Sequence, residues 1–160
     1  MADHGDVWWT ELNTHNPEKA VKFYSKILGL EARTTAMTDM SRPPKAGEPS
    51  YTMFFKGGMP ALGVFTMDGD MFKGVPDHWF TYFAVDNIDK SVKAVTVAGG
   101  AIVRPPFEVP GTGRIAIVKD ANGGVFGIGT PAAMEAPAAA AKPKAATVKK
   151  AAPKKAKAKA

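Results

Sequence analysis

The sequence contains one pattern twice, in residues 7–32 and again in residues 78–103. The two stretches lie 71 positions apart, and the similar pairs are Trp9 and Phe80, Leu12 and Phe83, Asn16 and Asn87, Lys19 and Lys90, Val21 and Val92, and Gly29 and Gly100. Each stretch predicts a strand, a capping residue, a short helix and a glycine that ends the helix. A repeat of this size predicts one pseudo-symmetric domain of two similar halves, with its working surface between them.

The first half predicts a strand, a helix and three more strands. Residues 7–13 alternate, with Trp8, Thr10 and Leu12 on one face of the strand and Val7, Trp9, Glu11 and Asn13 on the other. Asn16 followed by Pro17 predicts the start of a helix, and Gly29 predicts its end. The following strands are predicted at residues 31–37, 51–56 and 61–67, with a loop at residues 38–50.

The second half predicts the same order of elements. Residues 79–85 form the first strand, and Asp86 or Asn87 caps a helix that runs through Ala98. Three strands follow, at residues 101–104, 114–119 and 125–129, with a loop at residues 105–113. Gly63-Val64-Phe65 is echoed 61 positions later by Gly124-Val125-Phe126. The predicted fold class is therefore α+β, with two βαβββ modules at residues 7–67 and 78–130 after a flexible start at residues 1–6.

Composition excludes several classes of protein. The chain of 160 residues has no cysteine, which excludes disulfides, thiol catalysis and cysteine-bound zinc. No apolar run is long enough to cross a membrane, and the acidic first residues do not form a signal peptide. We therefore expect a cytoplasmic protein without membrane contact.

The positive charge is confined to the end of the chain. Residues 132–160 consist mostly of Ala, Lys and Pro and hold eight lysines, at positions 142, 144, 149, 150, 154, 155, 157 and 159. Such a segment has too little apolar surface to fold, so it predicts a disordered basic tail. Lys142, Lys144, Lys149, Lys150, Lys154, Lys155, Lys157 and Lys159 could bind nucleic acid or another polyanion non-specifically by counterion release. The alternative is an inert, solubilising extension. The tail resembles those of linker histones.

The body of the chain resembles the glyoxalase/bleomycin-resistance/dioxygenase superfamily, also called the vicinal oxygen chelate fold. The stretches that carry the resemblance are residues 16–24 (NPEKAVKFY), 28–30 (LGL), 79–86 (WFTYFAVD) and 119–126 (KDANGGVF). The resemblance implies one domain, residues 7–131, in which two βαβββ modules curve a sheet around a concave cavity. It also implies a homodimer.

Metal-dependent members of that family hold a divalent ion between the two halves. The resemblance places the four ligand positions at Trp9, Thr66, Phe80 and Gly127. None offers an imidazole or a carboxylate, whereas a catalytic metal needs about three suitable protein ligands. We therefore expect neither a metal nor a cofactor. Trp9 and Phe80 would instead line the cavity with aromatic surface, as in metal-free antibiotic-binding members, or simply fill the core.

Several polar residues are candidates for chemistry in the same cavity. Glu11 and His78 share the predicted inward face and would be cross-strand neighbours, so that the carboxylate could orient the imidazole as a general base. The alternative is a solvent-facing His78 at a strand start. Tyr82, the repeat partner of Glu11, also points inward, and Asn13 and Thr66 add hydrogen-bonding capacity.

Three functions follow from these patterns. The first is a metal-free protein that binds a small aromatic or hydrophobic molecule through Trp9, Glu11, Asn13, Thr66, His78, Phe80 and Tyr82. The second is an enzyme of lyase or dioxygenase type that uses Glu11, His78 or Tyr82, or an atypical metal. The third is a protein that associates with DNA or another polyanion through its basic tail.

Overall fold

The computed structural model describes residues 2–132, and the tail predicted for residues 132–160 lies outside this range from residue 133 onward. The first half contains β1 (Val7–Thr14), α1 (Pro17–Leu28), β2 (Glu31–Ala36), β3 (Ser50–Lys56) and β4 (Met59–Thr66). The second half contains β5 (His78–Ala84), α2 (Ile88–Val97), β6 (Ala101–Val109), β7 (Gly113–Lys119) and β8 (Val125–Pro131), and a short 3-10 helix, η1 (Asp70–Phe72), lies between the halves. The predicted order of two βαβββ modules is confirmed.

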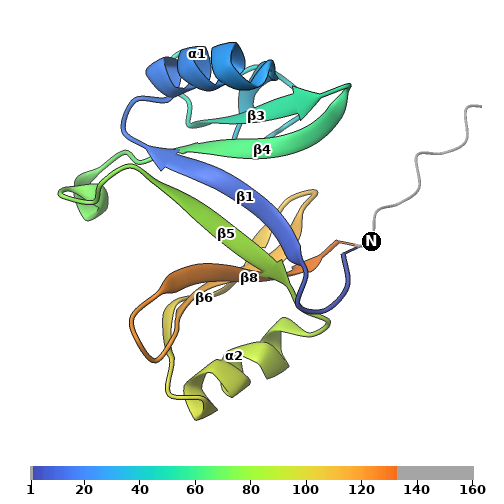
Figure 1. Ribbon diagram of the computed structural model, residues 1–160, viewed down its shortest axis with the longest axis vertical. Helices are drawn as coiled ribbons and strands as arrows, with labels where there is room; N and C mark the ends of the chain where they lie inside the picture. Colours follow the sequence, from blue (N-terminus) through green and yellow to red (C-terminus); the bar gives the residue numbers. More distant parts are fainter. Residues whose placement is uncertain (1, 133–160) are drawn as a thin grey trace, which may run out of the picture.

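All strands form one sheet, in the order β2-β3-β4-β1-β5-β8-β7-β6. β1 and β5 pair antiparallel in the middle and join the two modules. Thr10 pairs with Thr81, its own repeat partner, so the pseudo-twofold axis passes between these two residues. The sheet curls so strongly that α1 and α2 lie at opposite ends of the molecule (Figure 1). The face without helices is therefore the inner, concave face.

Each helix begins at an asparagine, as predicted. The side chain of Asn16 accepts a hydrogen bond from the backbone N–H of Lys19 at 3.0 Å, and Asn87 accepts one from Lys90 at 2.9 Å. Gly29 ends α1 in the left-handed conformation, with a φ of 63°, which costs a glycine little. These local signals determine where the helices start and stop.

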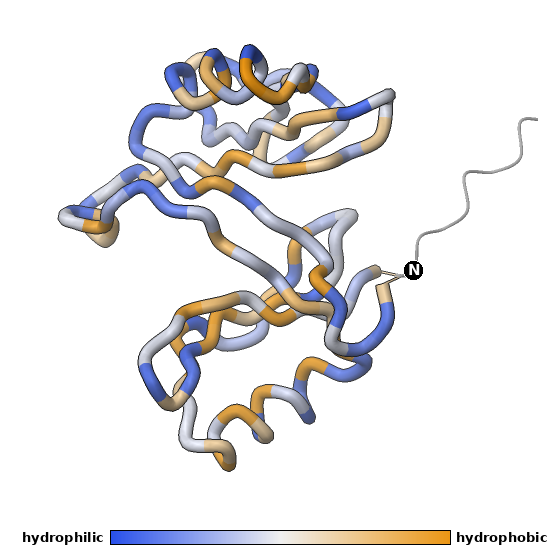
Figure 2. Tube along the Cα trace, in the orientation of Figure 1, coloured by the Kyte–Doolittle hydropathy of each residue, from blue (hydrophilic) through white to orange (hydrophobic). Residues whose placement is uncertain are grey.

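The hydrophobic core is divided between the two ends of the sheet. In the first module Leu30, Phe54 and Val64 are buried, and Val21 and Tyr24 of α1 pack against them. In the second module the buried cluster lies under α2 and consists of Val85, Ile88, Ala116, Val118 and Ile128. In Figure 2, β4 and β8 are coloured as more hydrophobic than the central strands β1 and β5. The polar centre of the sheet is consistent with a functional surface there.

Strand β6 is longer than the sequence predicts. Residues 105–109, which we expect to be part of a loop, continue the strand to Val109 despite Pro105 and Pro106. β6 is an edge strand, so a proline that lacks an N–H removes no hydrogen bond from an outer neighbour. Register shifts on both sides of Arg104 accommodate the two prolines.

A bulge in β1 changes the face of one tryptophan. Val7 pairs with Phe83 but Trp9 pairs with Tyr82, so Trp8 is an extra residue in the strand. A Cβ built on Gly129 would lie 2.2 Å from the Trp8 ring, and Gly129 faces away from the core that lies under α2. Trp8 therefore lies on the concave face, and the prediction that it shares the face of Leu12 is wrong, because strict alternation does not hold across a bulge.

Residues near the start of the described chain form backbone hydrogen bonds with the end of β5. The sequence predicts flexibility for residues 1–6. The N–H of Gly5 donates to the carbonyl of Ala84 at 2.9 Å, and the N–H of Ala84 donates to the carbonyl of Asp6.

Within residues 2–132, no helix has the length and apolar character that crossing a membrane would need.

Candidate functional site

The centre of the concave face is formed by four side chains around the pseudo-twofold axis. The strand register places Trp9 opposite Tyr82 and Glu11 opposite Phe80. The Phe80 and Tyr82 rings lie 5.1 Å apart, edge to face. Phe80 is buried and Trp9 is half-buried. The prediction that Trp9 and Phe80 turn away from the helices is confirmed.

Glu11 is a buried carboxylate held by hydroxyl donors. It is 7% exposed. The Tyr51 hydroxyl donates to its Oε2 at 2.7 Å, and the Tyr82 hydroxyl donates to its Oε1 at 2.9 Å. The indole Nε1 of Trp9 in turn donates to the Tyr51 hydroxyl at 2.8 Å. Within residues 2–132, no Lys, Arg or His forms an ion pair with Glu11.

This environment changes the proton affinity of all three acidic groups. Burial raises the pKa of Glu11, and the hydrogen bonds from Tyr51 and Tyr82 oppose that rise only in part. Burial and the adjacent Glu11 carboxylate raise the pKa of Tyr51 and the pKa of Tyr82. A carboxyl group whose pKa moves toward neutrality can both hold and release a proton. The group of Trp9, Glu11, Tyr51 and Tyr82, here called the Glu11 network, therefore combines aromatic surface with a buried carboxyl group whose pKa is raised.

His78 does not join the Glu11 network. It pairs with Asn13 rather than with Glu11, because the register is shifted by two residues from the predicted one. Its Nε2 lies 3.3 Å from the Asn13 amide nitrogen, and its Nδ1 lies 2.8 Å from the carbonyl oxygen of Pro76. The prediction that Glu11 and His78 are cross-strand neighbours is therefore wrong. His78 and Asn13 form a separate polar pair beside the Phe80 ring.

Thr66 is not the fourth position of the expected metal site. Gly63 pairs with Glu11 in the first module and Gly127 pairs with Tyr82 in the second. Because Glu11 and Tyr82 are repeat partners, Gly63 is the counterpart of Gly127. Thr66 lies three residues further, at the end of β4. The sequence echo that led to Thr66 is displaced by three residues, because the two modules differ in their loops.

Aromatic rings fill the space that ligand side chains would need at Gly63 and Gly127. A Cβ on Gly63 would lie 1.9 Å from the Tyr51 hydroxyl, and a Cβ on Gly127 would lie 2.0 Å from the Tyr82 ring. Trp9, Gly63, Phe80 and Gly127 offer no donor for a divalent ion, and both oxygens of Glu11 already accept hydrogen bonds. Among residues 2–132, His, Asp and Glu nowhere gather in threes as a metal site requires. The residues present do not fit the family's divalent ion.

Sequence reasoning missed Tyr51, Gly63 and the inward position of Trp8. Tyr51 lies on β3, which is separated from β1 by the whole of β4, so no local pattern links Tyr51 with Glu11. A tyrosine that opens a predicted strand, together with a glycine in the next strand, is a weak signal for a ring that packs over a backbone.

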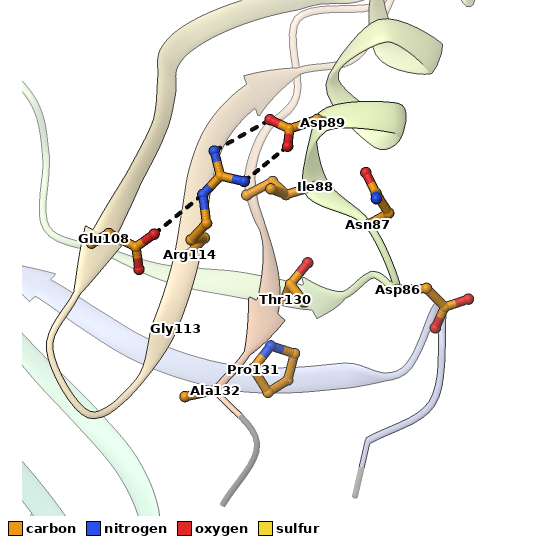
Figure 3. Close-up of a pocket in the computed structure, with 10 residues that line it drawn as sticks. All are labelled: Asp86, Asn87, Ile88, Asp89, Glu108, Gly113, Arg114, Thr130, Pro131 and Ala132. Atoms are coloured by element: carbon orange, nitrogen blue, oxygen red, sulfur yellow. Dashed lines mark hydrogen bonds and ion pairs between the residues drawn. The ribbon is translucent and has the colours of Figure 1, made fainter.

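Two polar residues outside the Glu11 network, Arg114 and His15, have structural partners. Arg114 donates to both carboxylate oxygens of Asp89, at 2.9 and 3.2 Å, and lies 3.3 Å from Glu108 (Figure 3). These residues line a hollow of about 330 Å³ at the start of α2, away from the Glu11 network. His15 directly follows β1. Its Nδ1 lies 3.0 Å from the carbonyl oxygen of Met67, and its Nε2 lies 2.8 Å from the carbonyl oxygen of Val75.

Comparison with known proteins gives relatives of two kinds. CFP32 of Mycobacterium bovis, named as a glyoxylase, is 32% identical over 133 residues, which are 82% of this chain and 46% of that protein. DnrV of Streptomyces peucetius, named as an anthracycline biosynthesis protein, is 30% identical over 138 residues, which are 79% of this chain and 47% of that protein. This chain therefore spans about half the length of the curated relatives that it matches.

Solved structures share the fold. A methylmalonyl-CoA epimerase variant from Streptomyces coelicolor superimposes with a TM-score of 0.58 at 16% identity, over 84% of this chain and 100% of that chain. The protein BH1468 of Bacillus halodurans gives a TM-score of 0.58 at 11% identity, over 81% and 96% of the two chains. The family profile described as Glyoxalase/Bleomycin resistance protein/Dioxygenase superfamily matches residues 7–128. With the repeated βαβββ modules and the curled sheet, this match shows that the chain belongs to the glyoxalase/bleomycin resistance protein/dioxygenase superfamily.

Proposed function

We propose that the protein binds a small planar aromatic or hydrophobic molecule on its concave face, without a divalent ion. One observation carries the proposal: the four positions around the expected ion hold Trp9, Phe80 and two glycines covered by tyrosine rings. Aromatic rings stack on planar ligands and contribute about 0.5–1.5 kcal/mol per pair beyond the buried area. Few polar groups among apolar walls are also typical of small-molecule sites.

The name of one relative supports a planar ligand. DnrV is named for anthracycline biosynthesis, and anthracyclines contain fused planar rings. An indole with its N–H already bonded to Tyr51 presents its ring face rather than its polar edge. Trp9 is therefore the proposed stacking surface, and the rim of the face adds hydrogen-bonding groups at Asn13 and His78.

A thermal-shift screen of the full chain tests this proposal. Soluble anthraquinone sulfonates, as planar probes, should raise the melting temperature, because a ligand at about 100 times its Kd stabilises a folded state by about 2.7 kcal/mol. Their saturated analogues, Ni²⁺ and Zn²⁺ should not. Divalent ion retained at one per chain after purification would contradict the proposal.

Two tryptophan variants localise the binding. Trp9→Leu should weaken binding of the planar probe about tenfold or more, a loss of about 1.4 kcal/mol. Trp79→Leu is the matched control, because Trp79 lies on the other face of the sheet against Tyr24. Equal effects of the two variants would place the ligand elsewhere.

A second candidate function, an enzymatic one, is favoured by the Glu11 network alone. A buried acid whose pKa is raised is suited to moving a proton to or from a bound molecule, with Tyr51 or Tyr82 as relay. Compounds that stabilise the protein can be incubated with it in D₂O and followed by NMR. Deuterium incorporation that disappears in Glu11→Gln, while binding persists, would support an enzyme, and absence of exchange would favour a binding protein.

A further inference from the structure

Arg104 is an arginine without a carboxylate partner. The chain has four arginines, and three of them, Arg33, Arg42 and Arg114, each form an ion pair with an Asp or a Glu. Within residues 2–132, Arg104 forms no ion pair, and its guanidinium donates no hydrogen bond. Its side chain is exposed. The five N–H donors of this guanidinium are therefore available to a bound molecule.

The strand pairing places Arg104 on the concave face, in one row with the Glu11 network. Arg104 of β6 pairs with Ile117 of β7. Ile117 pairs with Gly127 of β8, which in turn pairs with Tyr82 of β5. The side chains of directly paired residues lie on the same face of a sheet. Arg104 therefore lies on the same face of the sheet as the proposed ligand.

The guanidinium of Arg104 is held against apolar surface. Its central carbon lies over the Phe107 ring, 3.5 Å from the ring centroid, and a guanidinium that stacks on a ring keeps its N–H donors free at its edge. Phe107 pairs with Ile115 of β7. Ile115 in turn pairs with Gly129, which the Trp8 ring covers. Next to such an apolar surface, a positive charge attracts an anion more strongly than it does in open water.

The charge of Arg104 also acts on the Glu11 network. Burial and the Glu11 carboxylate raise the pKa of Tyr82, and the positive charge of Arg104 opposes part of that rise. Arg104 and the Tyr82 hydroxyl are therefore close enough for one to influence the other. A molecule that is bound over the network would meet the same positive charge.

The first module has an arginine at the equivalent position, but a carboxylate lies beside it. Arg33 is the repeat partner of Arg104, 71 positions earlier. Its Nη2 lies 3.7 Å from Oε2 of Glu31, and its guanidinium carbon lies 4.3 Å from the centroid of the Phe55 ring. In the second module Ile102 stands in place of Glu31. An anion on the concave face is therefore attracted to the edge formed by β6 rather than to the edge formed by β2.

We propose that Arg104 binds the acidic group of the ligand, which is a planar aromatic acid with a carboxylate or a sulfonate at one end. This inference rests on the proposed binding of a planar molecule to the concave face, and it adds the charge and the orientation of that molecule. The ring system lies over the Glu11 network, and the anionic group points toward β6. A guanidinium binds such a group through two parallel N–H···O hydrogen bonds. Because Glu11 belongs to the first module, this orientation also keeps the two acidic groups apart.

Calorimetric titration of the full chain with two matched probes tests this inference. An anthraquinone sulfonate carries a negative charge, whereas the corresponding sulfonamide has the same rings and is neutral at neutral pH. The wild type should bind the sulfonate about tenfold more tightly than the sulfonamide, a difference of about 1.4 kcal/mol. Arg104→Gln should weaken sulfonate binding by this factor and bring the two probes to equal affinity. Arg104→Lys should retain part of the preference, because lysine keeps the charge but lacks the planar fork.

Two controls separate Arg104 from other positive charges. Arg33→Gln is the matched variant, because Arg33 occupies the equivalent place beside Glu31, and this variant should keep the preference for the sulfonate. The eight lysines from Lys142 to Lys159 remain in every variant, so a preference that is due to them would survive in Arg104→Gln. Circular dichroism checks the fold of each variant.

The outcomes distinguish this inference from the proposed function. Binding of both probes by the wild type with equal affinity would overturn the role of Arg104 and leave the binding of a planar molecule standing. A preference that survives in Arg104→Gln, or one that Arg33→Gln abolishes equally, would overturn that role as well. If the wild type bound neither probe, the proposed function would fail and this inference would fail with it.

Discussion

The two modules share a framework but differ on both of their surfaces. Asn16 and Asn87 cap equivalent helices, and the buried clusters occupy equivalent places under them. On the concave face, however, Glu11 in the first module corresponds to Tyr82 in the second. On the outer face, Phe23 corresponds to Ala94. The two modules are alike at the helix caps and buried clusters that the fold requires, and they differ on the surfaces where another molecule could bind.

The differences also make the concave face electrostatically uneven. Tyr51, on β3, donates to Glu11, whereas the equivalent position on β7 is Ile115, opposite Gly129. The buried acid and one of its two donors thus belong to the first module, and the second module contributes only Tyr82. A symmetric ligand would meet two different halves. The following predictions test how far the two modules are equivalent.

The largest expected effect comes from the two covered glycines. Gly127→Ala places a Cβ 2.0 Å from the Tyr82 ring. The ring cannot move away without a new rotamer, so we expect the free energy of unfolding to fall by about 3 kcal/mol. Gly63→Ala meets the far end of Tyr51 and should cost less, about 1–2 kcal/mol. Urea unfolding of both variants gives the comparison. Equal losses would show that the rings on the two modules are held equally firmly.

Substitution of the two tyrosines should affect stability in the opposite order from the two glycines, with the larger loss in the first module. Tyr51→Phe removes a donor to buried Glu11 and also the acceptor for the Trp9 N–H, so it should cost about 2–3 kcal/mol. Tyr82→Phe removes one donor only and should cost about 1.5 kcal/mol. Chemical denaturation at fixed pH measures both. A larger loss for Tyr82→Phe would contradict the network as described.

Part of this site could be predicted from sequence and part could not. The caps at Asn16 and Asn87 and the inward faces of Trp9 and Phe80 follow from local patterns, which the structure retains. The register between β1 and β5 does not follow, because a shift by two residues leaves every side chain on the same face. That shift separates Glu11 from His78 and brings Tyr82 opposite Trp9.

Other features depend on contacts between distant parts of the chain. The bulge at Trp8 and the extension of β6 through Pro105 arise from pairing with neighbouring strands, not from the residues themselves. Tyr51 reaches Glu11 from 40 positions away, across an intervening strand. A repeat in the sequence indicates the shared framework, but it does not show what the two modules do at the positions where they differ.

The pH dependence of stability tests the buried acid of the first module. Its pKa is raised in the folded state from the ordinary value of 4.5, so the folded protein binds more protons than the unfolded chain above that pH. The free energy of unfolding should therefore fall as pH rises from 4.5 through the raised pKa, by at most about 1.4 kcal/mol per pH unit. Glu11→Gln should remove this fall, whereas the exposed Glu18→Gln should retain it. The same slope in wild type and Glu11→Gln would refute the assignment.

The smallest effects test the shared framework, where the modules should behave alike. Asn16→Ala and Asn87→Ala each remove one side-chain acceptor from a helix start, so each should lower the free energy of unfolding by about 1 kcal/mol. Asn122→Ala, an exposed position in the β7–β8 turn, is the control and should change it by less than about 0.5 kcal/mol. Thermal unfolding of the three variants measures the differences. If one cap cost twice as much as the other, the divergence of the modules would extend to the framework, because α1, with no buried residue, would then depend on its cap more than α2, whose first residue Ile88 is buried.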